Sequence, residues 1–177
     1  MKKIAVTSTG STYSDGKAIV EVVAGRLSHR GETLAVAESC TGGMLSETIT
    51  GVSGASRFFL GGVVAYDNSV KTALLGVKQD TLDEEGAVSE SVARQMAKGA
   101  REALGAGYGI GITGIAGPDG GTAEKPVGLV YIGVSSETAD EVMAFNFQGA
   151  RDEVRRASVT AALQMLARII PGEEAAH

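Results

Sequence analysis

Residues 33–51, TLAVAESCTGGMLSETITG, contain the unit that decides the fold, which is a short strand leading directly into a helix. Residues 33–37 alternate in polarity as a strand does. Residues 44–49 carry apolar side chains at helical spacing, and Gly51 ends that helix. A strand followed at once by a helix is the building block of an α/β domain.

Strands and helices alternate along the rest of the chain. Further strands are predicted at 58–66, 108–113, 129–134 and 142–147, the first of them buried. A first helix is predicted from a cap at Ser14 or Asp15 to a stop at Gly31, and further helices at 69–75, 90–104 and 152–170, with Asn68 and Ser89 as N-caps. The last two strands are joined by too few residues for a parallel crossover, so they should be antiparallel. The sequence therefore predicts an α/β fold, a three-layer α/β/α sandwich with a mixed β-sheet.

Composition restricts the function classes. The chain has 177 residues and a net charge of -5 with only two His, one Cys and no Trp, which argues against a nucleic-acid partner, a disulfide framework and a zinc site. No apolar run reaches the ~20 residues that a membrane span needs. We expect one cytoplasmic domain over residues 17–177, without metal, cofactor or membrane contact. Residues 1–16 are predicted to be an N-terminal arm or the remnant of a linker.

Two glycine-rich segments could bind a ligand. In AESCTGG, residues 37–43, a strand ends where a helix begins, and free amides at a helix N-terminus suit an anion such as phosphate. A capped helix with a glycine-rich turn explains that segment equally well. The loop at 114–128 follows a strand, and ligands of open α/β sheets bind at the carboxyl edge. A loop of this length is usually functional, although simple flexibility is the alternative.

A third constellation combines Ser56, Tyr66 and Lys71. An ammonium in the first turn of a helix opposes the helix dipole, so Lys71 should have a lowered pKa and act as a neutral base. A neutral lysine can activate a serine hydroxyl where no histidine is at hand. A solvated surface lysine is the competing interpretation. Cys40 is the rival nucleophile, but a structural role in the core is favoured for it.

Five motifs in this order resemble one known family. They are AESCTGG (37–43), FFLGGVVAYDNSVKTALLGV (58–77), GAVSESVA (86–93), GITGIAGPDGG (111–121) and EKPVG (124–128). Together they resemble the CinA carboxyl-terminal domain family, the nicotinamide mononucleotide deamidases (PncC). The resemblance runs from about Lys17 to the last helix. In longer family members another domain precedes this one, and residues 1–16 resemble the join where it would end.

The resemblance implies a function and a set of roles. The expected reaction hydrolyses the carboxamide of nicotinamide mononucleotide to nicotinate mononucleotide and ammonia, in a homodimer that needs no metal. Ser56 matches the family's nucleophile, Lys71 its basic partner, Tyr66 the tyrosine between them and Ser39 the serine of AESCTGG. The positions that match the nucleotide-holding loops are Thr41, Gly42, Gly43, Thr113, Gly114 and Gly117.

Two hypotheses follow for the activity. In the first, neutral Lys71 takes the proton of Ser56, which attacks the carboxamide carbon and forms an acyl-enzyme. Tyr66 donates to the leaving nitrogen or holds Lys71, and Ser39 orients the substrate or relays a proton. In the second, the domain is a non-catalytic nucleotide-binding or regulatory module. For the arginines at the start of the last helix, Arg151, Arg155 and Arg156, a solvated face is the default expectation. A position near a phosphate or a partner subunit is the alternative.

Overall fold

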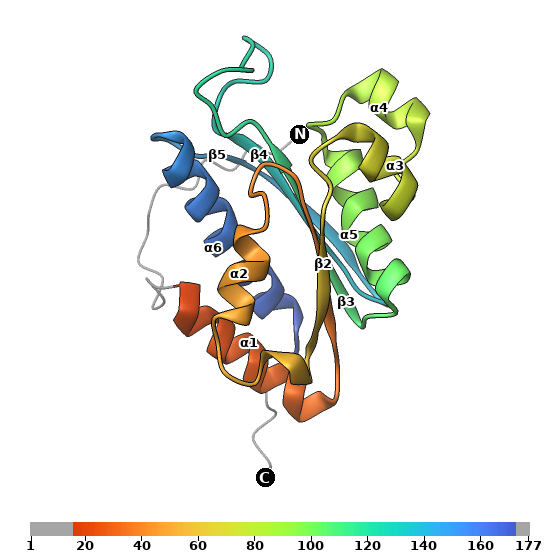
Figure 1. Cartoon of the computed structure of the whole chain (residues 1–177), viewed down its shortest axis with the longest axis vertical. Coiled ribbons are helices and arrows are strands. Elements are labelled where there is room, and N and C mark those ends of the chain that lie inside the picture. Colours follow the sequence, from red (N-terminus) through yellow and green to blue (C-terminus); the bar gives the residue numbers. More distant parts are fainter. Residues whose placement is uncertain (1–15, 173–177) are drawn as a thin grey trace.

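A computed structural model of the chain describes residues 16–172, which form one sheet with helices on both of its faces (Figure 1). The predicted arm lies almost entirely outside these residues, and the cap predicted at Ser14 or Asp15 lies wholly outside them. The elements are α1 (Gly16–Arg30), β1 (Leu34–Glu38), α2 (Met44–Thr50), the short 3-10 helix η1 (Ala55–Arg57), β2 (Phe59–Val64), α3 (Asn68–Leu75), α4 (Gln79–Glu85), α5 (Glu90–Leu104), β3 (Tyr108–Gly114), β4 (Leu129–Ser135), β5 (Asp140–Asn146) and α6 (Arg151–Ile169).

The sheet has five strands in the order β2-β1-β3-β4-β5. β1 runs parallel to both β2 and β3, whereas the β3–β4 and β4–β5 pairs are antiparallel. The predicted antiparallel pairing of the last two strands and the mixed sheet are thus confirmed. Because the crossovers place β1, β2 and β3 in the same direction, their carboxyl ends lie along one edge of the sheet.

Helices cover the two faces and create two cores, as the predicted three-layer sandwich requires. On one face, α1, α2 and α6 pack their apolar side chains against the sheet around Phe58, Ile110 and Leu163. On the other face, α5 packs against the sheet, and α3 and α4 pack beside α5. No helix within residues 16–172 is long and apolar enough to cross a membrane.

Glycines in β3 let α5 approach the sheet closely. A Cβ at Gly109 would lie 2.1 Å from the Ala97 carbonyl oxygen, and one at Gly111 would lie 2.5 Å from the Ala97 nitrogen. Neither distance is compatible with a side chain. The Gly-x-Gly pattern of this strand is therefore required for packing between helix and sheet.

Two predictions about the elements were wrong. The strand predicted as buried, β2, is an edge strand with Leu60 and Val64 each 47% exposed. Its apolar sequence FLGGVV is typical of an interior strand, but a strand is interior only if another strand pairs with it on each side, and the sequence of β2 does not show this. The N-cap of α3 is Asp67, whose side chain accepts a hydrogen bond from the Ser69 amide, and not Asn68.

Candidate active site

A polar cavity of about 280 Å³ opens where β1, β2 and β3 end. It is lined by residues following each of these strands, by the start of α3, by the loop after β3 and by one side chain of α6. Among the predicted site residues, the structure brings together in this cavity Ser39, Tyr66, Lys71, Thr113, Gly114 and Gly117. The carboxyl edge of the sheet therefore holds the pocket, as expected for an open α/β sheet. A larger hollow of about 400 Å³ between α1, β5 and α6 is mostly apolar and contains none of the predicted residues.

Lys71 is the chemically distinctive group of the pocket. Its side chain is only 1% exposed, and Nζ donates to the carbonyl oxygens of Ala65 at 2.8 Å and Tyr66 at 3.2 Å. Burial lowers the pKa of the Lys71 amine, while the nearby Asp67 carboxylate partly opposes this shift. A neutral amine has two N–H bonds and one lone pair. Because two carbonyls can accept both N–H groups, the lone pair is left to point away from them and act as a base.

The predicted anion site at the start of α2 is already filled by a side chain. The buried carboxylate of Glu38 accepts hydrogen bonds from the amides of Gly43, Leu45 and Ser46 at 2.8–3.1 Å and from the Ser46 hydroxyl at 2.7 Å. The amides that would have held a phosphate are thus satisfied within the chain. Of the two interpretations left open for AESCTGG, the structure supports the capped helix.

Thr41, Gly42 and Gly43 accordingly do not line the cavity. Thr41 is fully buried, and its hydroxyl has no hydrogen-bond partner within residues 16–172. The Gly42 amide donates to the Ser39 carbonyl oxygen, which closes a turn after β1. Gly42 and Gly43 have φ angles of 59° and 100°, in the region that favours glycine, so these two residues shape the turn.

The second glycine-rich loop, unlike the first, faces the cavity with its glycines. Thr113 is the last residue but one of β3, and its hydroxyl donates to the Ala87 carbonyl oxygen at 2.7 Å, which fixes the loop before α5 against the sheet. Gly114 and Gly117 follow on the cavity wall, together with Asp119. This loop therefore provides the backbone that a ligand would meet.

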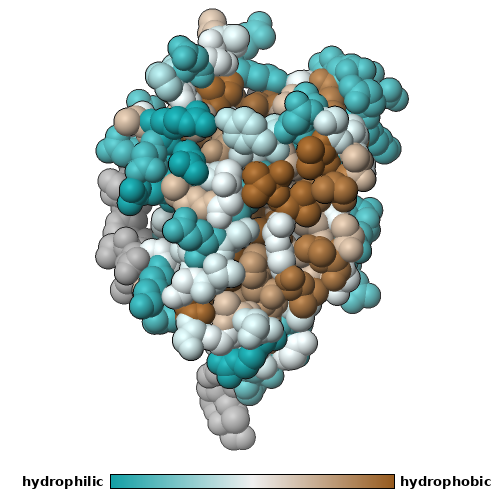
Figure 2. Space-filling model, in the orientation of Figure 1, coloured by the Kyte–Doolittle hydropathy of each residue, from teal (hydrophilic) through white to brown (hydrophobic). Residues whose placement is uncertain are grey.

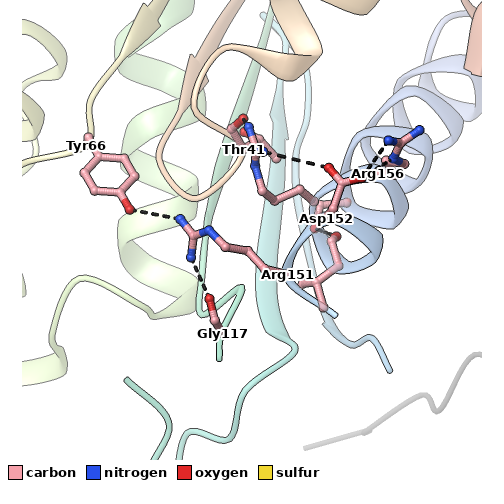
Figure 3. A network of polar contacts seen from close by, with 9 residues as sticks. Thr41, Tyr66, Gly117, Arg151, Asp152 and Arg156 are labelled. Carbon is pink, nitrogen blue, oxygen red and sulfur yellow. Dashed lines mark hydrogen bonds and ion pairs between the residues drawn. The ribbon is translucent and has the colours of Figure 1, made fainter. Parts of the chain in front are cut away.

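Arg151 lies in the pocket, although a solvated face was the default expectation for it from the sequence. It starts α6, and its guanidinium reaches across to donate to the Gly117 carbonyl oxygen at 2.7 Å and to the Tyr66 hydroxyl at 3.2 Å (Figure 3). Neither acceptor is an anion, and Arg151 forms no ion pair with any residue between 16 and 172. The signal in the sequence was an arginine at a helix N-terminus, where a cation is unfavourable unless something else requires it. Arg155 bonds the Thr41 carbonyl oxygen, and Arg156 pairs with Asp152 on the same helix.

Ser56 lies at the other end of the sheet. It belongs to η1, which precedes β2, whereas Tyr66 and Lys71 follow β2. The six residues of β2 separate the two ends by roughly 20 Å at ~3.3 Å per residue. Within one chain, the structure therefore does not bring the predicted nucleophile to its predicted base. The short separation of Ser56 and Lys71 in the sequence did not indicate this distance, because the residues between them form an extended strand.

Cys40 lines the cavity but is poorly suited to attack a substrate. Burial raises the pKa of its thiol to about 11, in spite of the nearby arginines. The reactive thiolate is therefore scarce at neutral pH. This supports the structural role that the sequence favoured for Cys40.

The fold and the pocket define a class of three-layer α/β domains with a polar ligand site at the carboxyl edge of a mixed sheet. Within that class, the chain belongs to the CinA family, because the sequence model of the CinA C-terminal domain family matches residues 16–170.

Individual relatives agree with this assignment. The chain is 49% identical over 156 residues to a CinA-like protein of Desulfotalea psychrophila, covering 88% of this chain and 38% of that protein. It is 52% identical over 157 residues to a CinA-like protein of Synechococcus sp., covering 88% and 37% respectively. The chain thus spans less than two fifths of the length of these curated relatives.

Solved structures show the same fold over nearly all of the chain. The competence/damage inducible protein CihA of Agrobacterium tumefaciens superposes with a TM-score of 0.86 at 36% identity, covering 90% of this chain and 98% of that one. A competence-damaged protein (CinA) superfamily protein of Escherichia coli gives 0.86 at 31% identity, covering 92% and 95%. These similarities extend the family assignment to the whole described domain.

Proposed function

We propose that this domain is an amidohydrolase that converts nicotinamide mononucleotide to nicotinate mononucleotide and ammonia. The observation that carries the proposal is the buried amine of Lys71, which has a lowered pKa and lies in a polar pocket beside an arginine. A neutral amine is a suitable base for activating a hydroxyl. The guanidinium of Arg151, which has no ion-pair partner among the described residues, is suited to the phosphate of a mononucleotide.

The substrate would lie along the cavity. Its phosphate would meet Arg151 and the loop of Gly114 and Gly117, and its carboxamide would be directed towards Lys71. Backbone amides of that loop are the proposed donors to the oxyanion, an interaction worth about 3–4 kcal/mol per donor. Tyr66 is held by Arg151 at the cavity wall and would donate to the leaving nitrogen or position Lys71.

The proposed chemistry proceeds through an acyl-enzyme. The serine oxygen forms a bond to the carboxamide carbon while its proton passes to Lys71 Nζ. The carbon–nitrogen bond then breaks, and the Lys71 ammonium returns the proton, so that ammonia leaves. Lys71 then takes a proton from water as the water oxygen bonds to the ester carbon. The carbon–oxygen bond to the serine breaks, the Lys71 ammonium returns the proton to the serine oxygen, and nicotinate mononucleotide is released.

The nucleophile in this proposal remains Ser56, with Ser39 orienting the substrate. Ser39 lies in the same cavity as Lys71, whereas Ser56 of the same chain lies at the far end of β2. The Ser56–Lys71 reaction therefore requires a second copy of the chain to supply the hydroxyl.

The separation of Ser56 from Lys71 also favours a second candidate function. A nucleotide-binding or regulatory module would need the arginine and the glycine-rich loop but no serine near the lysine. In that case Lys71 would be a structural donor that secures the two carbonyls of Ala65 and Tyr66.

Release of ammonia from nicotinamide mononucleotide by the purified protein separates the two functions. We expect turnover by the wild-type protein and at least a thousandfold loss in Ser56→Ala and Lys71→Met. Ser39→Ala should reduce the rate far less. Nucleotide binding without ammonia release in the wild-type protein would establish the binding module. Full activity of Ser56→Ala beside an inactive Ser39→Ala would identify Ser39 as the nucleophile.

A further inference from the structure

The pocket contains two opposite charges that do not pair with each other. Among the described residues that line it, Arg151 is a cation and Asp119 is the one carboxylate. Arg151 donates to Gly117 and Tyr66, neither of which is charged. Asp119 has neither a hydrogen bond nor an ion pair within residues 16–172. One charge of each sign is therefore available to a ligand.

Asp119 is held in place by the glycines on either side of it. A Cβ at Gly117 would lie 2.5 Å from Val127 Cγ1, and one at Gly121 would lie 2.8 Å from the Val127 nitrogen. Both ends of the turn thus pack closely against Val127, and the Gly117 carbonyl is also bonded to Arg151. Because the turn is anchored at both ends, Asp119 in its middle occupies a defined position on the cavity wall.

The carboxylate of Asp119 has no structural role in this part of the chain. Asp67 caps α3 by accepting from the amide and hydroxyl of Ser69, and Glu38 accepts from amides at the start of α2. An aspartate that stabilises its own turn would accept a hydrogen bond from the backbone two residues on, and among the described residues Asp119 accepts none. A carboxylate also repels a phosphate in the same pocket. Its presence there therefore indicates a second, positively charged group on the ligand.

We propose that Asp119 is a specificity residue whose carboxylate pairs with the cationic ring of an oxidised pyridine mononucleotide, while Arg151 holds the phosphate. This inference rests on the proposed function and names the feature of the substrate that the same site recognises. Nicotinamide mononucleotide carries both charges, one on the quaternary ring nitrogen and one on the phosphate, with the ribose between them. Its reduced form has the same phosphate, ribose and carboxamide, but its ring is neutral.

The two charged residues are close enough to contact one mononucleotide. Figure 2 shows hydrophilic surface over the start of α6, to which Arg151 belongs, and apolar surface over β2 and the helices beside it. Arg151 is bonded to the carbonyl of Gly117, and Asp119 is two residues further along the chain (Figure 3). Two residues span at most about 7 Å, so Asp119 lies near the guanidinium without pairing with it. A phosphate and a ring joined by a single ribose fit this arrangement.

Binding of the two redox forms tests the assignment. Asp119→Asn keeps the size of the side chain and its ability to form hydrogen bonds but removes its charge. Calorimetric titrations with oxidised and reduced nicotinamide mononucleotide are made in a Lys71→Met background, in which the carboxamide should stay intact. We expect the oxidised form to bind about fivefold more tightly, as for a partly exposed ion pair, and Asp119→Asn to abolish this preference by weakening the oxidised form alone. Glu124→Gln, an exposed position of the same loop that does not line the cavity, should keep the preference.

Three results would overturn the assignment. The first is an Asp119→Asn protein that keeps the full preference for the oxidised form. The second is an equal loss of affinity for both forms, which would assign Asp119 to the ribose hydroxyls that they share. The third is the absence of any preference before Asp119 is replaced.

Kinetics with Lys71 in place give a second measurement. Asp119→Asn should raise KM for oxidised nicotinamide mononucleotide about fivefold with little change in kcat, whereas Glu124→Gln should change neither. An unchanged KM in Asp119→Asn beside normal ammonia release would refute the role of Asp119 and leave the proposed function intact. If the wild-type protein releases no ammonia, the titrations are made in the wild-type background. A preference that depends on Asp119 in such a protein would support the recognition of the ring charge and refute the proposed hydrolysis.

Discussion

Replacing Glu38 by glutamine should destabilise the domain strongly, although Glu38 touches no ligand pocket. The carboxylate accepts four hydrogen bonds, two on each oxygen, from three amides and one hydroxyl. In glutamine one of these oxygens becomes an NH2 group, which faces donors and can accept nothing. The Ser46 hydroxyl can turn to accept from that NH2, so the arrangement that costs least leaves one buried amide unpaired.

The magnitude follows from these contacts. Hydrogen bonds to a charged group contribute about 1.5–3 kcal/mol each, and an unpaired buried donor costs about 1–3 kcal/mol. Losing one charge-assisted bond and weakening the others should lower the free energy of unfolding by about 3 kcal/mol. For a domain of this size, 1 kcal/mol corresponds to about 2–4 °C in melting temperature, so we expect a decrease of about 6–12 °C.

Thermal unfolding followed by circular dichroism measures this decrease. Glu47→Gln is the matched control, since Glu47 lies exposed on the same helix and should change the melting temperature by no more than about 2 °C. A Glu38→Gln protein that melts with the wild type would show that the α2 amides do not depend on this carboxylate. The helix terminus would then again be available to an external anion.

Three further predictions concern the pocket. Burial lowers the pKa of Lys71, and only the neutral amine is a base, so kcat/KM should rise with pH through a pKa below the ordinary lysine value of 10.5. A kcat/KM that is independent of pH between 6 and 10 would contradict the role of Lys71 as base. Arg151→Met should raise KM for the nucleotide by about 10–100-fold with little change in kcat, because a charge-assisted contact to phosphate is lost. Arg156→Met, at an exposed position of the same helix, is the control, and an Arg151→Met protein with the KM of the wild type would exclude Arg151 from the binding site. Cys40→Ala should keep most of the turnover, since its thiol stays protonated, and an inactive Cys40→Ala protein of normal stability would make Cys40 essential.

The elements with clear local signals were predicted well. Ser89 caps α5 and Gly105 ends it, and the short connection between β4 and β5 forces them to be antiparallel. The helix α4 was missed because its sequence, QDTLDEE, is almost entirely polar and buries only Leu82. Local capping and periodicity act within a few residues, so a sequence reports them directly.

The candidate site was predicted in part. Lys71, Tyr66 and Ser39 do share a pocket with the loop of Thr113 and Gly117, because all follow parallel strands. The structure does not support the predicted anion site at Gly43, since the buried Glu38 carboxylate accepts hydrogen bonds from the amides there. A glutamate five residues before a helix-starting glycine has two possible uses, as a surface charge or as a cap. Which of the two uses applies depends on the direction in which the Glu38 side chain points from β1, and only the structure shows that direction.

By itself, the sequence determined the main alternation of strands and helices, the Ser89 cap of α5, the family, and the residue types of the pocket. Only the tertiary structure decided that β2 lies at the edge of the sheet, that Glu38 closes the start of α2, that Arg151 reaches the pocket from α6, and that Ser56 lies far from Lys71 in the same chain. The physical reason is the range of the forces. Helix and strand periods arise from interactions between neighbouring residues. Strand order and contacts across the sheet arise from packing between segments that are far apart in the sequence, and the sequence separation of two segments does not indicate their distance in space.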